Sequence, residues 1–310
     1  MTESTSQRRV AIVTGAGRGM GRTYALALSD SGVRVVVNDR DADVAQAVAR
    51  EVTERGGIAV HNSYDIVASP EELVAHAIDA YGQLDIVVNN AGALGTTMFA
   101  ETTSQDWHRL CDMHIRSAVG VCRSSWNHLL QSDAGRIINV SSVGMLGNPG
   151  FTAYGTGKAG VFGFTNSLAT EAAATNITVN CILPSAWTRM TAEFPDPVLR
   201  DIFEQHFAAE HVASFVAKLA GPACTFNGEA FEVGGGWASR VQLTFGPAVD
   251  ITGSSSEAWA EQSEALLGEG ELTAVRTPSE WLGVEVSRVA PELSKGVFDT
   301  PTEFNTVEYK

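Results

Sequence analysis

Short apolar runs rich in Val and Ile alternate with longer amphipathic segments along most of the chain. The apolar runs have the length of buried strands and occupy residues 10–14, 33–38, 58–61, 84–89, 136–140 and 177–182. Helical spacing of apolar residues between them predicts helices over 19–31, 43–55, 70–81, 104–130 and 153–174. Buried strands that alternate with helices are typical of a parallel sheet covered on both faces. We therefore expect a doubly wound α/β fold.

The last part of the chain, residues 246–310, has a different composition. It opens with a Ser-rich stretch, contains several Gly and Pro residues, and holds 4 basic against 12 acidic residues. Helical patterns within it predict helices over 256–267 and 278–289. We expect residues 1–245 to form one α/β domain and residues 246–310 an acidic extension that is not an independent domain. The extension packs on the domain or on a neighbouring subunit, or forms a partly disordered tail.

The charge balance excludes two classes of partner. The chain has 21 basic and 36 acidic residues, a net charge of -15, which repels nucleic acids and anionic membrane surfaces. The beginning of the chain, MTESTSQRR, lacks the apolar stretch of a signal peptide, and no apolar run has the length of a membrane span. We expect a cytoplasmic protein. The four cysteines form no CxxC pair, and we expect no metal site.

A glycine-rich run, TGAGRGMG at 14–21, directly follows the first expected strand. The next helix begins within this run. Because glycine lacks a Cβ, such a loop lets a pyrophosphate approach the backbone N–H groups at a helix N-terminus. Gly15, Gly19 and Gly21 would supply this geometry. The position between a strand and a helix indicates a dinucleotide site, and a simple turn is the alternative.

Asp39 lies at the end of the second expected strand, about 20 residues after the glycine run. Its carboxylate can accept hydrogen bonds from the adenosine ribose hydroxyls, and it would repel a 2′-phosphate. Asp39 therefore favours NAD over NADP. Arg18 and Arg40 could pair with a 2′-phosphate. A solvated Arg, however, attracts that phosphate less strongly than a fixed carboxylate repels it. The alternative for Asp39 is a solvated turn residue.

Tyr154 and Lys158 are four residues apart in a helical segment, so both side chains project from one face. A phenol of pKa about 10 must lose roughly three pKa units to act as a base at neutral pH. A nearby ammonium and an oxidised nicotinamide together could supply this shift. Taken alone, the Tyr-x-x-x-Lys spacing is usually structural, so the interpretation depends on the other motifs.

Four motifs occur in the order and spacing of one enzyme family. They are TGAGRGMG at 14–21, NNAG at 89–92, SS at 141–142 and YGTGK at 154–158. Over residues 9 to about 240 the chain resembles the short-chain dehydrogenase/reductase family. The resemblance implies a Rossmann-like, doubly wound parallel sheet of seven strands, a small-molecule substrate, and assembly as a homodimer or homotetramer.

The resemblance also implies the roles of the catalytic residues. Tyr154 would exchange a proton with the substrate oxygen, and Lys158 would hold the ribose hydroxyls and lower the tyrosine pKa. A serine would orient the substrate carbonyl. Counting back from the tyrosine gives Ser141, whereas counting forward from the strand gives Ser142. We prefer Ser142, because a register slip would turn the side chains of a buried strand to the wrong face.

His114 stands where the wider family usually has an asparagine that takes part in the proton relay. In one subgroup, the (3R)-hydroxyacyl-CoA dehydrogenase units and related bacterial acyl-CoA or steroid dehydrogenases, a histidine occupies this position. RTYALAL at 22–28 and FEVGGGW at 231–237 are similar to that subgroup. A packed histidine without a chemical role is the alternative. The resemblance implies that further residues contact the cofactor: Arg18, Met20, Asp65, Ile66, Asn90, Ala91, Gly92 and Thr188.

These observations predict an NAD-dependent oxidoreductase that interconverts a secondary alcohol and a ketone. A 3-hydroxyacyl-CoA or a hydroxysteroid is the favoured substrate, and a small alcohol, sugar or terpenoid is the first alternative. The second alternative is a sensor or scaffold that binds NAD without turnover. The segment from Trp187 to Ala209 corresponds to the family's substrate lid, to which Phe194, Pro195, Pro197 and Phe203 give an apolar character.

Overall fold

The computed structural model describes residues 8–189, 191–193, 196–250, 252, 255, 258–268, 270–275 and 278–289. The chain divides into two compact units, Met1–Val241 and Gln242–Lys310. None of the helices in the described ranges is both long and apolar enough to cross a membrane.

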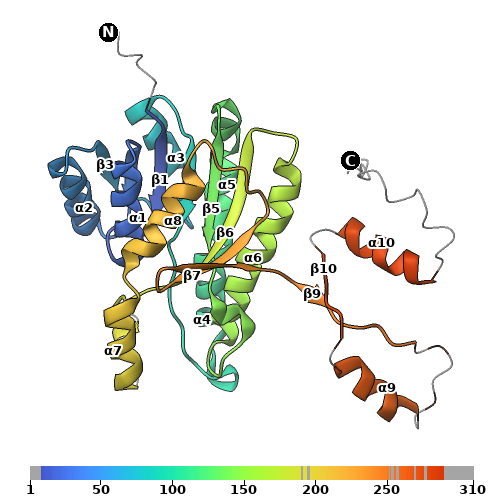
Figure 1. The fold of residues 1–310 in the computed structure, drawn as a ribbon. Helices are drawn as coiled ribbons and strands as arrows, with labels where there is room; N and C mark the ends of the chain where they lie inside the picture. The colour runs from blue at the N-terminus through green and yellow to red at the C-terminus, as the bar shows by residue number, and fades with distance from the viewer. Residues whose placement is uncertain are drawn as a thin grey trace. The chain divides into compact units, whose positions relative to one another are not determined.

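The first unit is built on an eight-stranded sheet with the order β3-β2-β1-β4-β5-β6-β7-β8 (Figure 1). The strands are β1 Val10–Thr14, β2 Arg34–Asn38, β3 Ala59–Asn62, β4 Ile86–Asn89, β5 Gly135–Val140, β6 Ile177–Ser185, β7 Ala230–Gly234 and β8 Trp237–Val241. Strands β1 to β7 are parallel, as the alternation of strands and helices predicts, whereas β8 is antiparallel to β7.

Helices cover both faces of this sheet, and the sheet separates two hydrophobic cores. The helices are α1 Gly19–Asp30, α2 Ala42–Glu54, α3 Pro70–Tyr81, α4 Ser104–Cys111, α5 Ser117–Gln131, α6 Thr152–Ala172, α7 Pro197–His206 and α8 Ala209–Ala220. Alternate residues of a strand point to opposite faces. Ala11 and Val13 of β1 therefore pack in the core of α1, α2 and α8, whereas Val10 and Ile12 pack in the core of α3, α5 and α6. The expected α/β fold is confirmed.

The eighth strand exceeds the seven expected. A two-residue turn, Gly235–Gly236, joins β7 to β8, with φ of +57° and +83°. Positive φ at both central residues is the requirement of a type I′ hairpin turn, which glycine meets without strain. The chain therefore turns back at the glycines of FEVGGGW, and β8 adds to the sheet as an antiparallel edge strand.

The segment predicted as one helix over 104–130 is interrupted. Thr103 caps α4 by accepting a hydrogen bond from the N–H of Asp106. One π-helical turn, Asp112–Arg116, then joins α4 to α5 and carries His114. A π turn inserts an extra residue and re-aims side chains, and such turns are frequent at functional sites. Apolar periodicity alone does not reveal it.

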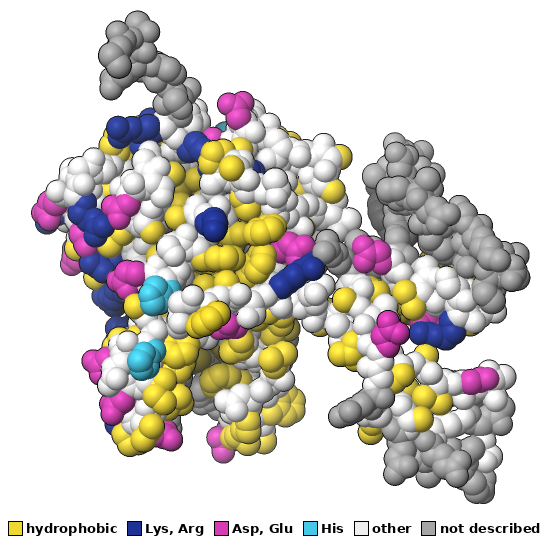
Figure 2. All heavy atoms as spheres, in the orientation of Figure 1, with side chains coloured by type: hydrophobic (Ala, Val, Ile, Leu, Met, Phe, Trp, Pro, Cys, Tyr) yellow, Lys and Arg dark blue, Asp and Glu magenta, His cyan; other side chains and the backbone are white. Residues whose placement is uncertain are grey.

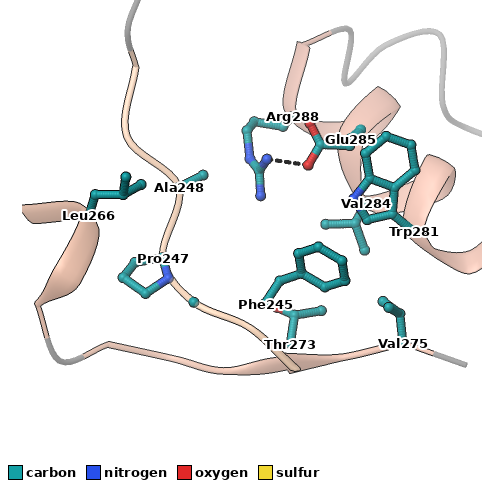
Figure 3. A pocket seen from close by; sticks show the side chains of 11 residues that line it. Phe245, Pro247, Ala248, Leu266, Thr273, Val275, Trp281, Val284, Glu285 and Arg288 are labelled. Atoms are coloured by element: carbon teal, nitrogen blue, oxygen red, sulfur yellow. Dashed lines mark hydrogen bonds and ion pairs between the residues drawn. The ribbon is translucent and has the colours of Figure 1, made fainter. Parts of the chain in front are cut away.

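The second unit contains α9 Ala258–Leu267, α10 Pro278–Val289 and a two-stranded sheet of β9 Thr244–Phe245 and β10 Thr273–Ala274. Both helices lie within the two expected ranges. This unit holds a pocket of about 250 Å³, and Figure 3 shows Phe245, Val284 and Trp281 among the apolar side chains that line it. Arg288 lies beside this lining and forms an ion pair with Glu285.

Candidate active site

The glycine loop and the NNAG turn are tied together at the carboxyl ends of β1 and β4. The Thr14 hydroxyl accepts hydrogen bonds from the N–H groups of Asn90 and Ala91 at 3.0 and 3.1 Å. The Asn90 side chain donates to the Thr14 carbonyl oxygen at 2.9 Å. A Cβ at Gly15 would lie 2.8 Å from the Ala91 Cα, and the φ of Gly15 is +61°. Only glycine permits this close approach.

The N-terminus of α1 has the features of an anion site. Its N-cap residue, Arg18, makes no side-chain capping hydrogen bond, and the first turn carries no acidic residue. A Cβ at Gly19 would have no atom within 4 Å, so the backbone borders open space. The first N–H groups of a helix lack intrahelical acceptors and carry partial positive charge. Gly19, Met20 and Gly21 therefore fit the pyrophosphate of a dinucleotide.

Asp39 is fixed at the end of β2. Its carboxylate accepts hydrogen bonds from the N–H of Gly17 at 3.1 Å and from the N–H of Asp41 at 3.2 Å. Arg18, which could have paired with a 2′-phosphate, forms an ion pair with Asp41 instead. Arg40 is exposed. The carboxylate thus has a defined position beside the glycine loop.

Asp65 and Ile66 lie between β3 and α3. The Asp65 carboxylate accepts a hydrogen bond from the N–H of Val67 at 2.8 Å, which stabilises the turn before α3. The Ile66 side chain is buried in the core below. Their backbone therefore has a fixed place near the carboxyl end of β3, the edge strand beside β2.

Tyr154 and Lys158 are both buried near the beginning of α6. The Lys158 ammonium donates to the carbonyl oxygen of Val140 at 2.8 Å, and burial lowers its pKa to about 8. Burial raises the pKa of the Tyr154 phenol, and a hydrogen bond with Ser142 partly opposes this rise. The Lys158 nitrogen lies 5.9 Å from the centre of the Tyr154 ring. The protein's own groups therefore favour the neutral phenol. The sequence interpretation, in contrast, predicts that the Lys158 ammonium helps to lower the phenol pKa.

The two serines after β5 point to different partners. The Ser141 side chain is 2% exposed and donates to the Lys158 carbonyl oxygen at 2.7 Å. The Ser142 hydroxyl accepts from the N–H of Gly144 at 3.0 Å, and its interaction with the Tyr154 phenol lowers the phenol pKa. Neighbouring residues of an extended chain face opposite sides. The structure thus places Ser142 near the phenol and turns Ser141 toward the backbone of α6.

His114 is buried against the tyrosine. Its ring meets the Tyr154 ring edge to face, with 5.3 Å between centres. The Ala93 carbonyl can only accept, so the 2.8 Å contact places a hydrogen on His114 Nε2. Nδ1 is buried without a hydrogen-bond partner. Burial, and secondly the charge of Lys158, lower the histidine pKa to about 3, so the ring is neutral near pH 7.

The segment after β6 is anchored at both ends. The N–H of Trp187 donates to the Phe207 carbonyl oxygen at 2.6 Å, and the N–H of Thr188 donates to the Thr191 hydroxyl at 2.8 Å. Phe203 stacks on Phe207 with 4.2 Å between ring centres. Pro197 begins α7. The other two apolar residues predicted for this lid, Phe194 and Pro195, lie outside the described residues.

Sequence reasoning missed three residues that shape the site. Thr14 joins the glycine loop to the NNAG turn, Val140 supplies the carbonyl that holds Lys158, and Phe151 packs edge-on against Tyr154 with 5.4 Å between ring centres. Thr14 and Val140 could have been found from their places at strand ends beside the motifs. Phe151 carries no such signal in the sequence.

Comparisons with known proteins agree with this geometry. A profile described as short chain dehydrogenase matches residues 9–197. Peroxisomal multifunctional enzyme type 2 of Mus musculus is 39% identical over 244 residues, which cover 76% of this chain and 32% of that protein. The 3-oxoacyl-(acyl-carrier-protein) reductase of Synechocystis sp. is 37% identical over 246 residues, which cover 76% of this chain and 98% of that protein. The chain therefore spans about a third of the length of the mouse relative.

One solved structure carries ligands. A 7α-hydroxysteroid dehydrogenase complexed with NADH and 7-oxo glycochenodeoxycholic acid matches with a TM-score of 0.69 and 28% identity. The match covers 76% of this chain and 98% of that chain.

Proposed function

Because the chain belongs to the short-chain dehydrogenase family, whose members are oxidoreductases acting on CH–OH groups, we propose that it is NAD-dependent and interconverts a secondary alcohol with a ketone. The favoured substrate is a 3-hydroxyacyl-CoA or a hydroxysteroid. The observation that carries the proposal is the buried Tyr154 side chain, with the Lys158 nitrogen 5.9 Å from its ring centre and both its ring and the Ser142 hydroxyl next to Gly144. A phenol so placed can exchange a proton with an alcohol oxygen.

The residues divide the chemistry among them. A bound nicotinamide supplies the hydride acceptor in one direction and the donor in the other. The Ser142 hydroxyl orients the substrate oxygen, and Tyr154 removes its proton during oxidation or returns it during reduction. Lys158, held by the Val140 carbonyl, places a positive charge near the Tyr154 ring and would hold the ribose hydroxyls of a bound cofactor. Neutral His114 packs on Tyr154 and limits its movement.

Several observations support an acyl or steroid substrate over the small-alcohol and sensor alternatives. The Synechocystis relative is named for an oxoacyl substrate, and the matched steroid dehydrogenase holds a steroid. His114 and FEVGGGW are similar to the acyl-CoA and steroid subgroup. A non-catalytic sensor would not need a serine and a lysine beside a buried phenol. We further propose that the enzyme acts as a homodimer or homotetramer, which light scattering would measure.

The direct test is a substrate panel. Purified protein is mixed with NAD and with 3-hydroxyacyl thioesters, hydroxysteroids, sugars and small alcohols, and the absorbance of reduced nicotinamide is followed. Turnover of a thioester or a steroid supports the proposal. Turnover of small alcohols alone favours the first alternative. Tight NAD binding without turnover of any alcohol favours the sensor.

The preference for NAD is tested at Asp39. Replacing Asp39 with Ala removes the carboxylate that would face a 2′-phosphate, so the ratio of kcat/KM for NADP to that for NAD is expected to rise roughly a hundredfold. Asp41→Asn is the matched control, because it releases Arg18 but keeps Asp39. Equal ratios in the wild type and in Asp39→Ala would contradict the assignment.

The choice between the serines is tested by paired substitutions. Ser142→Ala is expected to lower kcat about a hundredfold, because it removes a hydrogen bond that strengthens as charge develops on the substrate oxygen. Ser141→Ala removes the bond to the Lys158 carbonyl, so it is expected to lower stability by about 1 kcal/mol with a smaller change in kcat. The reverse order of kcat losses would assign the role to Ser141.

A further inference from the structure

Three segments follow strands at the end of the sheet where Tyr154 lies, and we call their described residues the rim: 93–103, 142–151, 186–189, 191–193 and 196–206. They follow β4, β5 and β6, which are parallel neighbours in the sheet, so their carboxyl ends lie side by side. The N–H of Thr97 donates to the Gly150 carbonyl oxygen at 2.9 Å and joins the first two segments. The third segment contains α7. Figure 2 shows a hollow beside α7, with hydrophobic side chains on both of its flanks.

The rim concentrates exposed apolar side chains. In the described part of the first unit, 14 large hydrophobic side chains are exposed, and 8 of them lie on the rim. They are Leu94, Met98, Phe99, Val143, Leu146, Val198, Leu199 and Ile202. Exposed apolar side chains gathered at one end of the sheet are a candidate binding surface, because their burial by a ligand is favourable in proportion to the area removed from water.

The rim is also acidic. Its sequence contains five acidic and two basic residues and no lysine, a net charge of -3. Glu193, Asp201 and Glu204 are all exposed on the third segment. The phosphates of coenzyme A carry about four negative charges at neutral pH, and a mouth of the same sign lowers their local concentration and their rate of entry. An uncharged molecule meets no such barrier.

Resting on the proposed function, we infer that the substrate is an uncharged, largely hydrocarbon alcohol of the hydroxysteroid kind, and that the rim selects against polyanionic coenzyme A esters. The apolar side chains of the rim cover the hydrocarbon body. Asp201 and Glu204 act as specificity-determining residues through their charge.

A matched pair of thioesters tests this inference. The same 3-hydroxyacyl group is offered on coenzyme A and on N-acetylcysteamine, which keeps the thioester and lacks the nucleotide, and an uncharged hydroxysteroid is tested alongside. At low salt, kcat/KM for the hydroxysteroid and for the N-acetylcysteamine thioester is expected to exceed that for the coenzyme A ester by about tenfold or more. The difference should narrow as salt screens the rim.

A coenzyme A ester that reacts faster than its N-acetylcysteamine counterpart would overturn the inference and leave the proposed function standing. If no alcohol is oxidised, the proposed function fails, and binding then decides the inference. Quenching of tryptophan fluorescence in the NAD-loaded protein is expected to show tighter binding of the hydroxysteroid than of the coenzyme A ester. The opposite order of affinities would overturn the inference.

Charge reversal on the rim sharpens the test. The double variant Asp201→Lys with Glu204→Lys is expected to raise kcat/KM for the coenzyme A ester about tenfold, with little change for the hydroxysteroid. The control is Asp133→Lys with Glu171→Lys. These two exposed positions lie at the other end of the sheet, before the amino ends of β5 and β6. An equal effect of both double variants on the coenzyme A ester would show that net charge matters rather than the rim.

A second pair of variants tests the apolar surface. Leu199 on the rim and Leu130 at the end of α5 are each 40% exposed. Leu199→Ser is expected to raise KM for the hydroxysteroid about fivefold, whereas Leu130→Ser should leave it unchanged. Equal values of KM in the two variants would contradict the role of the rim.

Discussion

Replacing Tyr154 with Phe is expected to lower kcat about a thousandfold while NAD binding and folding are retained. The substitution removes only the phenolic oxygen, and a positioned acid/base group contributes a factor of about 10² to 10⁴. The ring keeps its edge-on contacts with His114 and Phe151, so the buried packing survives. Stopped-flow turnover, NAD titration and thermal melting measure the three properties.

Phe151→Leu is the control for this substitution, because it disturbs the packing around the phenol but keeps the oxygen. It is expected to lower kcat much less than Tyr154→Phe does. A Tyr154→Phe variant that retains most of its turnover would remove Tyr154 from the chemistry. Because burial raises the phenol pKa, alcohol oxidation by the wild type is also expected to accelerate as pH rises above neutrality, while ketone reduction slows.

Replacing Lys158 with Met is expected to lower kcat/KM roughly a hundredfold and to change how stability depends on pH. In the wild type, burial lowers the Lys158 pKa to about 8, whereas an unfolded lysine has a pKa near 10.4. Between these values the unfolded chain binds more protons than the folded chain, so this group makes stability rise with pH. The cost of burying the ammonium is therefore present at neutral pH and is relieved above pH 8.

The measurable quantity is the difference in the free energy of unfolding between the wild type and Lys158→Met. It is expected to shift by about 2 kcal/mol in favour of the wild type between pH 7 and pH 9.5. Loss of the donor to the Val140 carbonyl adds a cost of about 1 to 3 kcal/mol to the variant at both pH values and cancels in this comparison. Denaturant titrations at the two pH values give the numbers. A difference that does not change with pH would show that the ammonium is not buried.

The sheet and most helices follow from the sequence because strand burial and helix periodicity are local patterns. The strands around Val10–Thr14 and Ile86–Asn89 are apolar on both faces, which only a covered parallel sheet explains. The π turn at Asp112–Arg116 does not follow, because one inserted residue barely disturbs a helical pattern. The hairpin between β7 and β8 does not follow either, because its glycine run is equally typical of a loop.

The candidate site could be predicted as a set of residues but not as an electrostatic arrangement. The four-residue spacing places Tyr154 and Lys158 on one face of α6, as expected. The directions of their pKa shifts depend on burial, which is a property of the assembled fold. The same holds for His114, whose protonation is decided by the Ala93 carbonyl and by the low-dielectric surroundings.

The strand order has a consequence for synthesis on the ribosome. After β4 pairs with β1, each later strand adds to the edge formed by the strand before it in the chain, from β5 through β8. The sheet can therefore grow as the chain emerges. The β1–β4 pairing spans the longest stretch of sequence in this sheet, so its loop-closure entropy makes it the expected slow step.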